Sequence, residues 1–289
     1  MRTLPLTIVS ASLLLPLASF AESPTSAHNQ HVSDSVLLKQ DKLLYANMYG
    51  NGFGPQSPRD IDSAAGTNAV AFNTAPPYQS MNLCNIHLHK NAEHKGGEFT
   101  KYAGNGDGHG YHTGYQFTGE LTEQELSPVA LKVKTDSHKA LMPGDTLEVH
   151  FVHSTAQVKP GPTLGACLSE EIKNPQLRVE AQVIVLVNDK NARDFRSLTK
   201  FNNRSGFYQA VNIPSNMGKP VQYAGSTTGP SYNIKGSPFQ VTWSVRPKVL
   251  KVDIATVNAW LNDNAFNEDH AHGVRNLVTR PEFLSPISH

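Results

Sequence analysis

Three histidines have the spacing of a metal site built on β-strands. His87 and His89 are two residues apart, so an extended strand places both imidazoles on one face. His150 lies in a second strand-like run, residues 147–153. If the two strands pair antiparallel, the three imidazoles can converge on one metal ion. Three imidazoles with one open position are typical of a catalytic zinc rather than of a closed structural site.

Each run also supplies a polar side chain that can orient a histidine. Asn85 lies two residues before His87, and Glu148 lies two residues before His150, in each case on the same strand face. A metal-bound imidazole needs an acceptor for its second ring nitrogen, and these side chains can provide one. The alternative is a set of ordinary surface histidines, since a His-x-His pattern alone is common and most such residues bind nothing.

The elements that must position these residues are mainly strands. Alternating apolar runs at 82–89, 146–152, 177–187 and 239–245 are separated by turns rich in Gly, Pro and Asn, which predicts an antiparallel β architecture. Only residues 254–261 are clearly helical, with Ile254, Val257 and Leu261 on one face. Residues 104–115 are glycine-rich and predict a surface loop. In residues 84–89, Cys84, Ile86 and Leu88 are expected to face away from the histidines. We therefore expect one β-rich domain without an interdomain linker.

Composition and the first residues bear on partners and location. The 289 residues include 25 basic and 24 acidic side chains, a net charge of +1, so a nucleic-acid partner is not expected. Residues 1–21 have a basic start, an apolar run and a small-x-small end, which predicts a secretory signal peptide. Residues 22–35 are expected to form a mobile leader and residues 36–289 the domain. No later run is long enough to span a bilayer, so we expect an exported protein, periplasmic or secreted.

Export gives a meaning to the two cysteines, Cys84 and Cys167. An even number of cysteines in an oxidising compartment favours one disulfide. The alternative is two separate buried thiols.

Seven short motifs, in order along the chain, resemble the carbonic anhydrase superfamily. They are residues 56–61 (QSPRDI), Asn68 with residues 71–73 (AFN), residues 85–89 (NIHLH), Glu93 with His94, residues 148–153 (EVHFVH), residues 225–230 (GSTTGP) and residues 241–243 (VTW). The segment between His94 and Glu148 is longer than in α-type enzymes, and HLHK replaces their HFHWG. Residues 84–96 (CNIHLHKNAEHKG) look more like the δ-type branch and its bacterial relatives.

The resemblance implies a fold, a cofactor and a reaction. The fold would be a central, largely antiparallel twisted sheet with few short helices. The reaction would be the reversible hydration of carbon dioxide to bicarbonate and a proton, by hydroxide formed at a zinc ion on His87, His89 and His150. Carbonic anhydrase is itself the standard example of zinc lowering the pKa of a bound water to about 7. Co²⁺ or Cd²⁺ can be held by the same imidazoles.

The resemblance also assigns roles to residues around the metal. Thr227 would accept the hydroxide proton and donate its own to Glu93, which fixes the orientation of the attacking oxygen; an ordinary turn is the other interpretation of Thr227 and Thr228. His94 fits a buried position behind the ligands, whereas His153 is expected to be a core histidine. The apolar wall of the carbon dioxide pocket would include Val152, Val241 and Trp243, with Thr228 beside it.

The path of the product proton is less determined. Fast α-type enzymes carry a histidine where this chain has Val70. Turnover is then either slower, or another imidazole replaces it, and His109 and His112 in the glycine-rich loop are the candidates. Asn68 and Asn73 could order water along this path.

Two other functions fit parts of the sequence. A non-catalytic relative could keep the fold as a binding or adhesion module, although such relatives typically lose a zinc histidine and all three positions are filled here. A periplasmic zinc-binding protein could use His109, His112, His270 and His272 to buffer metal, with an ordinary polar surface as the simpler interpretation of the last two. The sequence leaves the oligomeric state open.

Overall fold

The computed structural model describes residues 31–48, 60–62, 73–131, 139–228 and 236–274. Within these ranges the side chains of residues 48, 226–228, 236–238 and 240 are not described. The expected signal peptide, most of the expected leader, Asn68 and Val70 lie outside the described residues.

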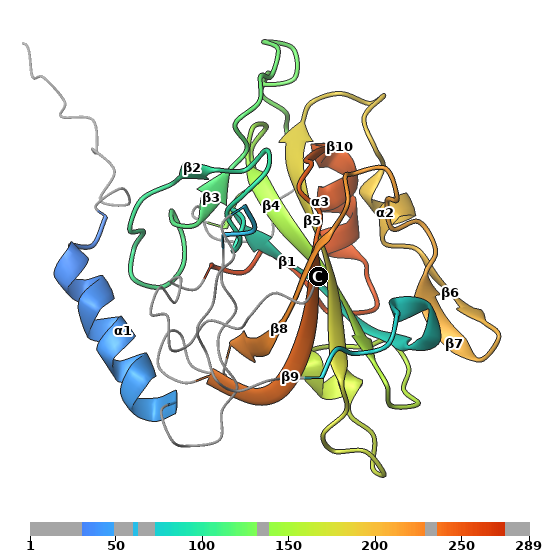
Figure 1. Ribbon diagram of the computed structural model, residues 1–289. Coiled ribbons are helices and arrows are strands. Elements are labelled where there is room, and N and C mark those ends of the chain that lie inside the picture. The colour runs from blue at the N-terminus through green and yellow to red at the C-terminus, as the bar shows by residue number, and fades with distance from the viewer. Residues whose placement is uncertain (1–30, 49–59, 63–72, 132–138, 229–235, 275–289) are drawn as a thin grey trace, which may run out of the picture.

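A twisted mixed sheet forms the centre of the molecule (Figure 1). Its strand order is β1-β4-β5-β9-β8, and β10 pairs with the second half of β5. The strands are β1 (Asn82–Lys90), β4 (Thr146–Ser154), β5 (Leu177–Val187), β8 (Val221–Thr228), β9 (Gly236–Val245) and β10 (Leu250–Asp253). The pairs β1–β4, β4–β5 and β8–β9 are antiparallel, whereas β5–β9 and β5–β10 are parallel. The predicted mainly β, single-domain architecture is confirmed.

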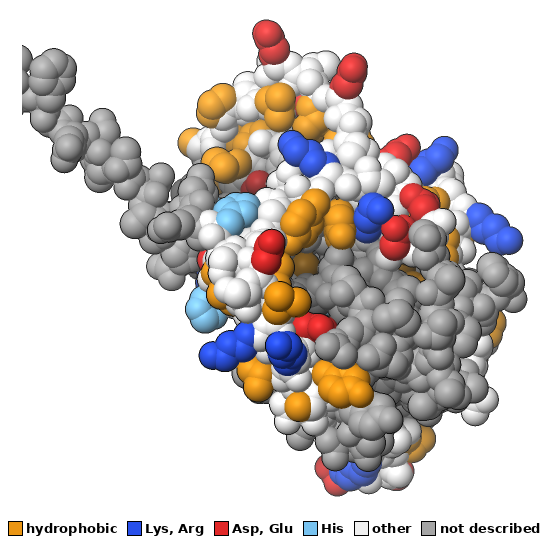
Figure 2. Space-filling model, turned by 60° about the vertical axis from the view of Figure 1, so that its left-hand side comes forward, with side chains coloured by type: hydrophobic (Ala, Val, Ile, Leu, Met, Phe, Trp, Pro, Cys, Tyr) orange, Lys and Arg blue, Asp and Glu red, His pale blue; other side chains and the backbone are white. Residues whose placement is uncertain are grey.

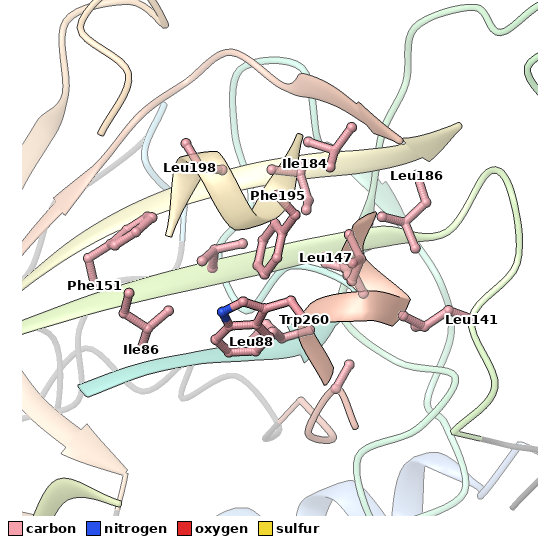
Figure 3. Packing of buried hydrophobic residues seen from close by; sticks show 14 of the residues in the cluster. Ile86, Leu88, Leu141, Leu147, Phe151, Ile184, Leu186, Phe195, Leu198 and Trp260 are labelled. Carbon is pink, nitrogen blue, oxygen red and sulfur yellow. The ribbon is translucent and has the colours of Figure 1, made fainter. Parts of the chain in front are cut away.

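One face of the sheet packs against two helices. Ile86 and Leu88 of β1 join Val149 and Phe151 of β4 in a buried apolar cluster. Helices α2 (Phe195–Leu198) and α3 (Ile254–Asn262) cover this cluster, and Figure 3 shows Phe195 and Trp260 among the strand side chains. The predicted helix at 254–261 is confirmed, but the third buried position is Trp260, and Leu261 is only half-buried.

The opposite face, which carries the histidines, has its own apolar cluster. Val152, Val179 and Trp243 come from neighbouring strands of the sheet and are buried in it. Cys84 also belongs to this cluster, so the expectation that it shares a face with Ile86 and Leu88 is wrong. The pairing of β1 with β4 shifts between Leu83 and Asn85, and a bulge there inserts one residue that reverses the alternation.

The bulge places Cys84 beside a short helical turn, η2 (Leu164–Cys167). Cys84 and Cys167 form a disulfide, so the disulfide prediction is confirmed. Both cysteines are fully buried, which shields the bond from reductants.

Helix α1 (Asp34–Met48) is an element that the sequence patterns did not predict. It begins at Asp34, two residues before the expected start of the domain, and lies beside the loop between β2 (Lys101–Tyr102) and β3 (Tyr115–Gln116) (Figure 1). Val32 donates a backbone hydrogen bond to Gly106 O at 2.8 Å, and Gln40 donates to Gly108 O at 3.2 Å.

The loop between β2 and β3 is the predicted glycine-rich loop, and it contains neither helix nor strand over residues 103–114. Gly104, Gly106, Gly108, Gly110 and Gly114 have positive φ angles, which L-amino acids with a Cβ adopt at a cost.

The remaining described elements are peripheral. η1 (Tyr78–Ser80) precedes β1, and β6 (Phe201–Arg204) and β7 (Phe207–Ala210) form a separate hairpin.

In the described part of the chain, the helices are too short or too polar to cross a membrane. Charged side chains of both signs are interspersed over the described surface in Figure 2, in keeping with the net charge of +1.

Candidate metal centre

The pairing of β1 with β4 brings the three histidines together. His87 lies directly opposite His150, and His89 lies opposite Glu148. The His150 ring centroid is 5.0 Å from that of His87 and 4.9 Å from that of His89, and the His87 and His89 centroids are 5.3 Å apart. One ring nitrogen from each histidine lies within 4.8 Å of the other two. The expected convergence of three imidazoles is therefore present in the geometry.

The second ring nitrogen of each histidine faces an acceptor. His87 Nδ1 is 2.7 Å from Asn85 Oδ1, and His89 Nδ1 is 3.2 Å from Gly273 O. His150 Nε2 is 3.2 Å from Glu148 Oε1. A neutral imidazole protonated on these nitrogens keeps its lone pair on the other one. The lone pairs available to a metal are therefore those of His87 Nε2, His89 Nε2 and His150 Nδ1.

The spacing of these nitrogens fits a tetrahedral metal ion. His87 Nε2 and His150 Nδ1 are 3.2 Å apart. Two nitrogens bound to one tetrahedral zinc at about 2.05 Å would be about 3.3 Å apart. A proton on either nitrogen would make this contact a hydrogen bond. Two unprotonated nitrogens at this distance would repel each other, and a cation between them would remove that repulsion.

His87 and His89 are also in the protonation state that a metal requires. Burial, with added repulsion from His150 and His89, holds the pKa of His87 well below 6.5. Burial lowers the pKa of His89 to about 4, although Glu93 acts against it. Neutral imidazoles near pH 7 need not lose a proton before they bind a cation.

Glu148 links the histidines to a second buried layer. Its Oε1 atom is 2.5 Å from His94 Nδ1, and its Oε2 atom accepts hydrogen bonds from the backbone amides of Glu93 and His94 at 2.6 and 3.1 Å. His94 Nε2 in turn contacts the hydroxyl of Tyr223. The His150 imidazole is therefore backed by a carboxylate whose own position is fixed by three further partners.

This carboxylate is held in its charged form. Burial acts to raise the pKa of Glu148, but the charge of His94 and the hydrogen bonds from His150 and His94 outweigh it, and the pKa lies well below 4.5. An ionised carboxylate behind an imidazole increases the electron density on the nitrogen that faces the metal.

Apolar side chains border the three-histidine cluster. The Trp243 ring centroid is 5.1 Å from that of His150 and 5.1 Å from that of His94. Val152, on the same face of β4 as His150, and Val241, in β9, are buried in the same apolar cluster. Of the residues expected to form an apolar wall, Trp243 therefore lies next to His150, and Val152 and Val241 belong to the same buried cluster as Trp243.

The remaining expected site residues lie in several different places. Thr227 and Thr228 end β8, but their side chains lie outside what the structure describes. Glu93 is buried, with its Oε1 atom 3.6 Å from His89 Nδ1. His153 is buried on the opposite face and its Nδ1 atom is 3.0 Å from Phe151 O. Asn73 is exposed, before η1.

His109 and His112 lie in the glycine-rich loop. Another histidine, His272, has its ring centroid 6.1 Å from that of His87 and 6.0 Å from that of His89. The ring centroids of His270 and His272 are 5.1 Å apart, and Glu268 Oε2 is 2.6 Å from His272 Nε2.

Two functional groups had no signal in the sequence patterns. The carbonyl of Gly273 orients His89 from 184 positions further along the chain, and a backbone oxygen has no residue-type signature. Tyr223 contacts His94 but lies in a strand that the alternating runs did not predict.

The sheet and the buried imidazole cluster define a mainly β protein with three histidines that could hold a metal ion. A family model described as Delta carbonic anhydrase matches residues 78–256, which is 179 of the 289 residues. The chain therefore belongs to the Delta carbonic anhydrase family, and the expected resemblance to this branch is confirmed.

Two solved structures to which this chain is similar are α-carbonic anhydrases. The α-carbonic anhydrase of Photobacterium profundum is 15% identical, with 82% of this chain and 91% of that chain covered and a TM-score of 0.27. The α-carbonic anhydrase of Thermovibrio ammonificans in complex with sulfanilamide is 14% identical, with 84% and 89% covered and a TM-score of 0.28. No curated protein matches the sequence.

Proposed function

We propose that the chain is an exported zinc carbonic anhydrase that interconverts carbon dioxide and bicarbonate. The observation that carries the proposal is the direction of the three imidazoles. Each of them has one nitrogen within 3.2 Å of an acceptor oxygen, and the remaining nitrogens of His87, His89 and His150 lie within 4.8 Å of one another. Membership of the Delta carbonic anhydrase family supports the same conclusion.

The ligands of the metal would be His87 Nε2, His89 Nε2 and His150 Nδ1. When bound there, zinc supplies a Lewis acid that makes hydroxide available near neutral pH. The chain contributes three uncharged ligands, which leave the positive charge of the ion uncompensated. It also contributes Asn85, Gly273 and Glu148, which fix the ring orientations before any metal arrives.

The apolar side chains near the site would receive the substrate. Carbon dioxide is small and apolar, and Trp243, which lies beside His150, belongs to one buried apolar cluster with Val152 and Val241. Such apolar side chains would exclude water from the substrate and leave its carbon open to attack.

Thr227 and Glu93 would orient the attacking oxygen. The family resemblance gives Thr227 the role of accepting a proton from that oxygen and donating its own to Glu93. The burial of Glu93 next to His89 supports its part in this chain of hydrogen bonds. The gain would be positional, because only one orientation of the oxygen satisfies both donors and acceptors.

Stopped-flow hydration of carbon dioxide by the purified chain tests the proposal. His150→Ala removes one of three ligands and should lower kcat/KM by at least about 100-fold. Lys173→Ala, at an exposed lysine that pairs with Glu170, should leave kcat/KM unchanged. Zinc content should be one ion per chain, whereas several weakly held ions would indicate a zinc buffer. A chain that binds zinc but gives no hydration, or a His150→Ala variant with full activity, would overturn the proposal.

A further inference from the structure

Gly273 and the glycine-rich loop form a layer behind one of the three histidines. The segment 271–274 lies against the end of β1, where His272 N donates to Leu88 O and Lys90 N donates to His272 O, each at 2.8 Å. This pairing holds the segment next to the strand that carries His87 and His89. The Gly273 carbonyl, one residue further on, is then in position to accept from His89 Nδ1.

The glycine-rich loop covers the other side of the same segment. Val274 N donates to Gly110 O at 2.7 Å, and Tyr111 donates its hydroxyl hydrogen to Ala271 O at 3.5 Å. The loop is itself tied to the end of β1, because Ala92 and Tyr115 exchange backbone hydrogen bonds of 2.8 and 2.9 Å. Segment 271–274 is therefore enclosed between β1 and the loop.

The contact between the loop and Gly273 leaves no room for a side chain. A Cβ atom at Gly273 would lie 2.9 Å from His109 O and 3.0 Å from Gly110 C and Cα. These atoms belong to the backbone, so a rotamer change cannot relieve the overlap. Any side chain at this position must move either the loop or the Gly273 carbonyl.

We propose that the glycine-rich loop, residues 104–115, sets the affinity of the site for zinc by holding the Gly273 carbonyl against His89, and we call this packing of the loop on Gly273 the clamp. The proposal rests on the proposed function, because it takes His89 Nε2 to be a zinc ligand. The Gly273 carbonyl keeps the imidazole protonated on Nδ1 and fixes its rotation, so that Nε2 faces His87 and His150. The loop keeps that carbonyl in place.

Residues at the start of helix α1 hold the glycine-rich loop on the side away from Gly273. Asn105, in the loop, donates from Nδ2 to Val32 O at 3.0 Å and to Asp34 Oδ1 at 2.8 Å. Loss of this side chain would loosen the loop without touching β1 or segment 271–274. Asn105→Ala is therefore a second, milder way to weaken the clamp.

Zinc affinity of the full-length chain, measured by competition with a chelator, tests the proposal. Gly273→Ala should weaken zinc binding about 10- to 100-fold, the usual cost of losing an outer partner of a metal ligand. Asn105→Ala should weaken it in the same direction by a smaller factor. In the cobalt-substituted protein, the visible spectrum of Gly273→Ala should differ from that of the wild type, since the ligand geometry changes. Gly165→Ala is the matched control, because its added Cβ would meet within 4 Å only the Thr163 hydroxyl, at 3.2 Å.

The outcomes separate this inference from the proposed function. A wild-type chain that binds no zinc overturns both. A wild-type chain that binds zinc and hydrates carbon dioxide, with Gly273→Ala and Asn105→Ala at wild-type affinity and unchanged cobalt spectra, overturns the clamp alone. If Gly273→Ala does not fold, unchanged zinc affinity in Asn105→Ala overturns the clamp.

Discussion

The candidate site depends on which nitrogen of each imidazole lies next to an acceptor oxygen, because the other nitrogen is then the one that can bind a metal. Asn85, Gly273 and Glu148 supply a side-chain amide, a backbone carbonyl and a carboxylate for the same purpose. Only the carboxylate carries charge, and it is held by His94 and two backbone amides as well. His150 is therefore the imidazole with the most strongly electron-rich partner.

At the residue scale, buried His153 makes the free energy of unfolding depend on pH. Burial, with the positive charges of Arg178 and Arg246 acting in the same direction, lowers the pKa of His153 from 6.5 to about 3, against the opposing hydrogen bond to Phe151. Between about pH 3 and pH 6.5, His153 is therefore protonated in the unfolded chain and neutral in the folded chain. Stability should be fully present above about pH 6.5 and fall as the pH drops toward 3, by at most about 1.4 kcal/mol per pH unit for this group.

Urea denaturation of the metal-free protein at about pH 7.5, 6 and 5 measures this slope. His153→Asn retains a donor for Phe151 O but does not titrate, so its slope should be shallower than that of the wild type. Equal slopes in the two proteins would contradict the assignment to His153.

The residue-scale features differ in how far the sequence could predict them. The convergence of His87, His89 and His150 follows from a period of two on paired strands, and Asn85 and Glu148 follow from the same periodicity. Gly273 does not, because its carbonyl acts through chain geometry and not through residue type. Tyr223 escaped for a related reason, since strand β8 lacks the alternation that marks the other site strands.

At the element scale, β1 shows how one residue changes the result of a strand pattern. Strict alternation puts Cys84 with Ile86 and Leu88, but the bulge after Leu83 turns it toward η2 and Cys167. A bulge depends on the partner strand, so the sequence of β1 alone could not predict it. Helix α1 escaped prediction because Leu44 is its only buried apolar residue among those described, which leaves a weak periodic signal.

The disulfide at this bulge should contribute substantially to stability. It joins residues separated by 83 positions, and loop-closure entropy for a loop of this length corresponds to about 4.5 kcal/mol. Chemical denaturation of the Cys84→Ala/Cys167→Ala double variant should show a loss of about this size. Wild-type protein unfolded under reducing conditions should show a similar loss, and a double variant as stable as the oxidised wild type would contradict the prediction.

At the scale of the whole molecule, the two faces of the sheet differ in composition. The face covered by α2 and α3 is an apolar core, and the other face carries the histidines with their own apolar cluster. The mainly β class and the single domain were predictable from repeated short strands and turns. The parallel pairing of β5 with both β9 and β10 was not, because parallel partners are joined by long connections that strand periodicity does not report.

Removal of the metal should lower the stability of the folded chain as a unit. Zinc that binds only the folded state stabilises it by about 4 kcal/mol when its free concentration is 1,000 times the dissociation constant. The zinc-loaded wild type should therefore unfold at a higher temperature than chelator-treated protein in calorimetry. For His150→Ala, addition of zinc should raise the unfolding temperature much less, and an equal rise in both proteins would place the zinc elsewhere.

Strand β1 is the outermost strand on its side of the sheet, and it carries two of the three histidines, while the third belongs to the strand inside it. A cation bound by residues of both strands would cross-link the edge strand to its neighbour. Without the cation, β1 would separate from β4 more readily than the inner strands separate from one another. Filling the site would therefore link the edge strand more firmly to the strand inside it, so that the ion needed for chemistry would also stabilise the sheet that holds its ligands.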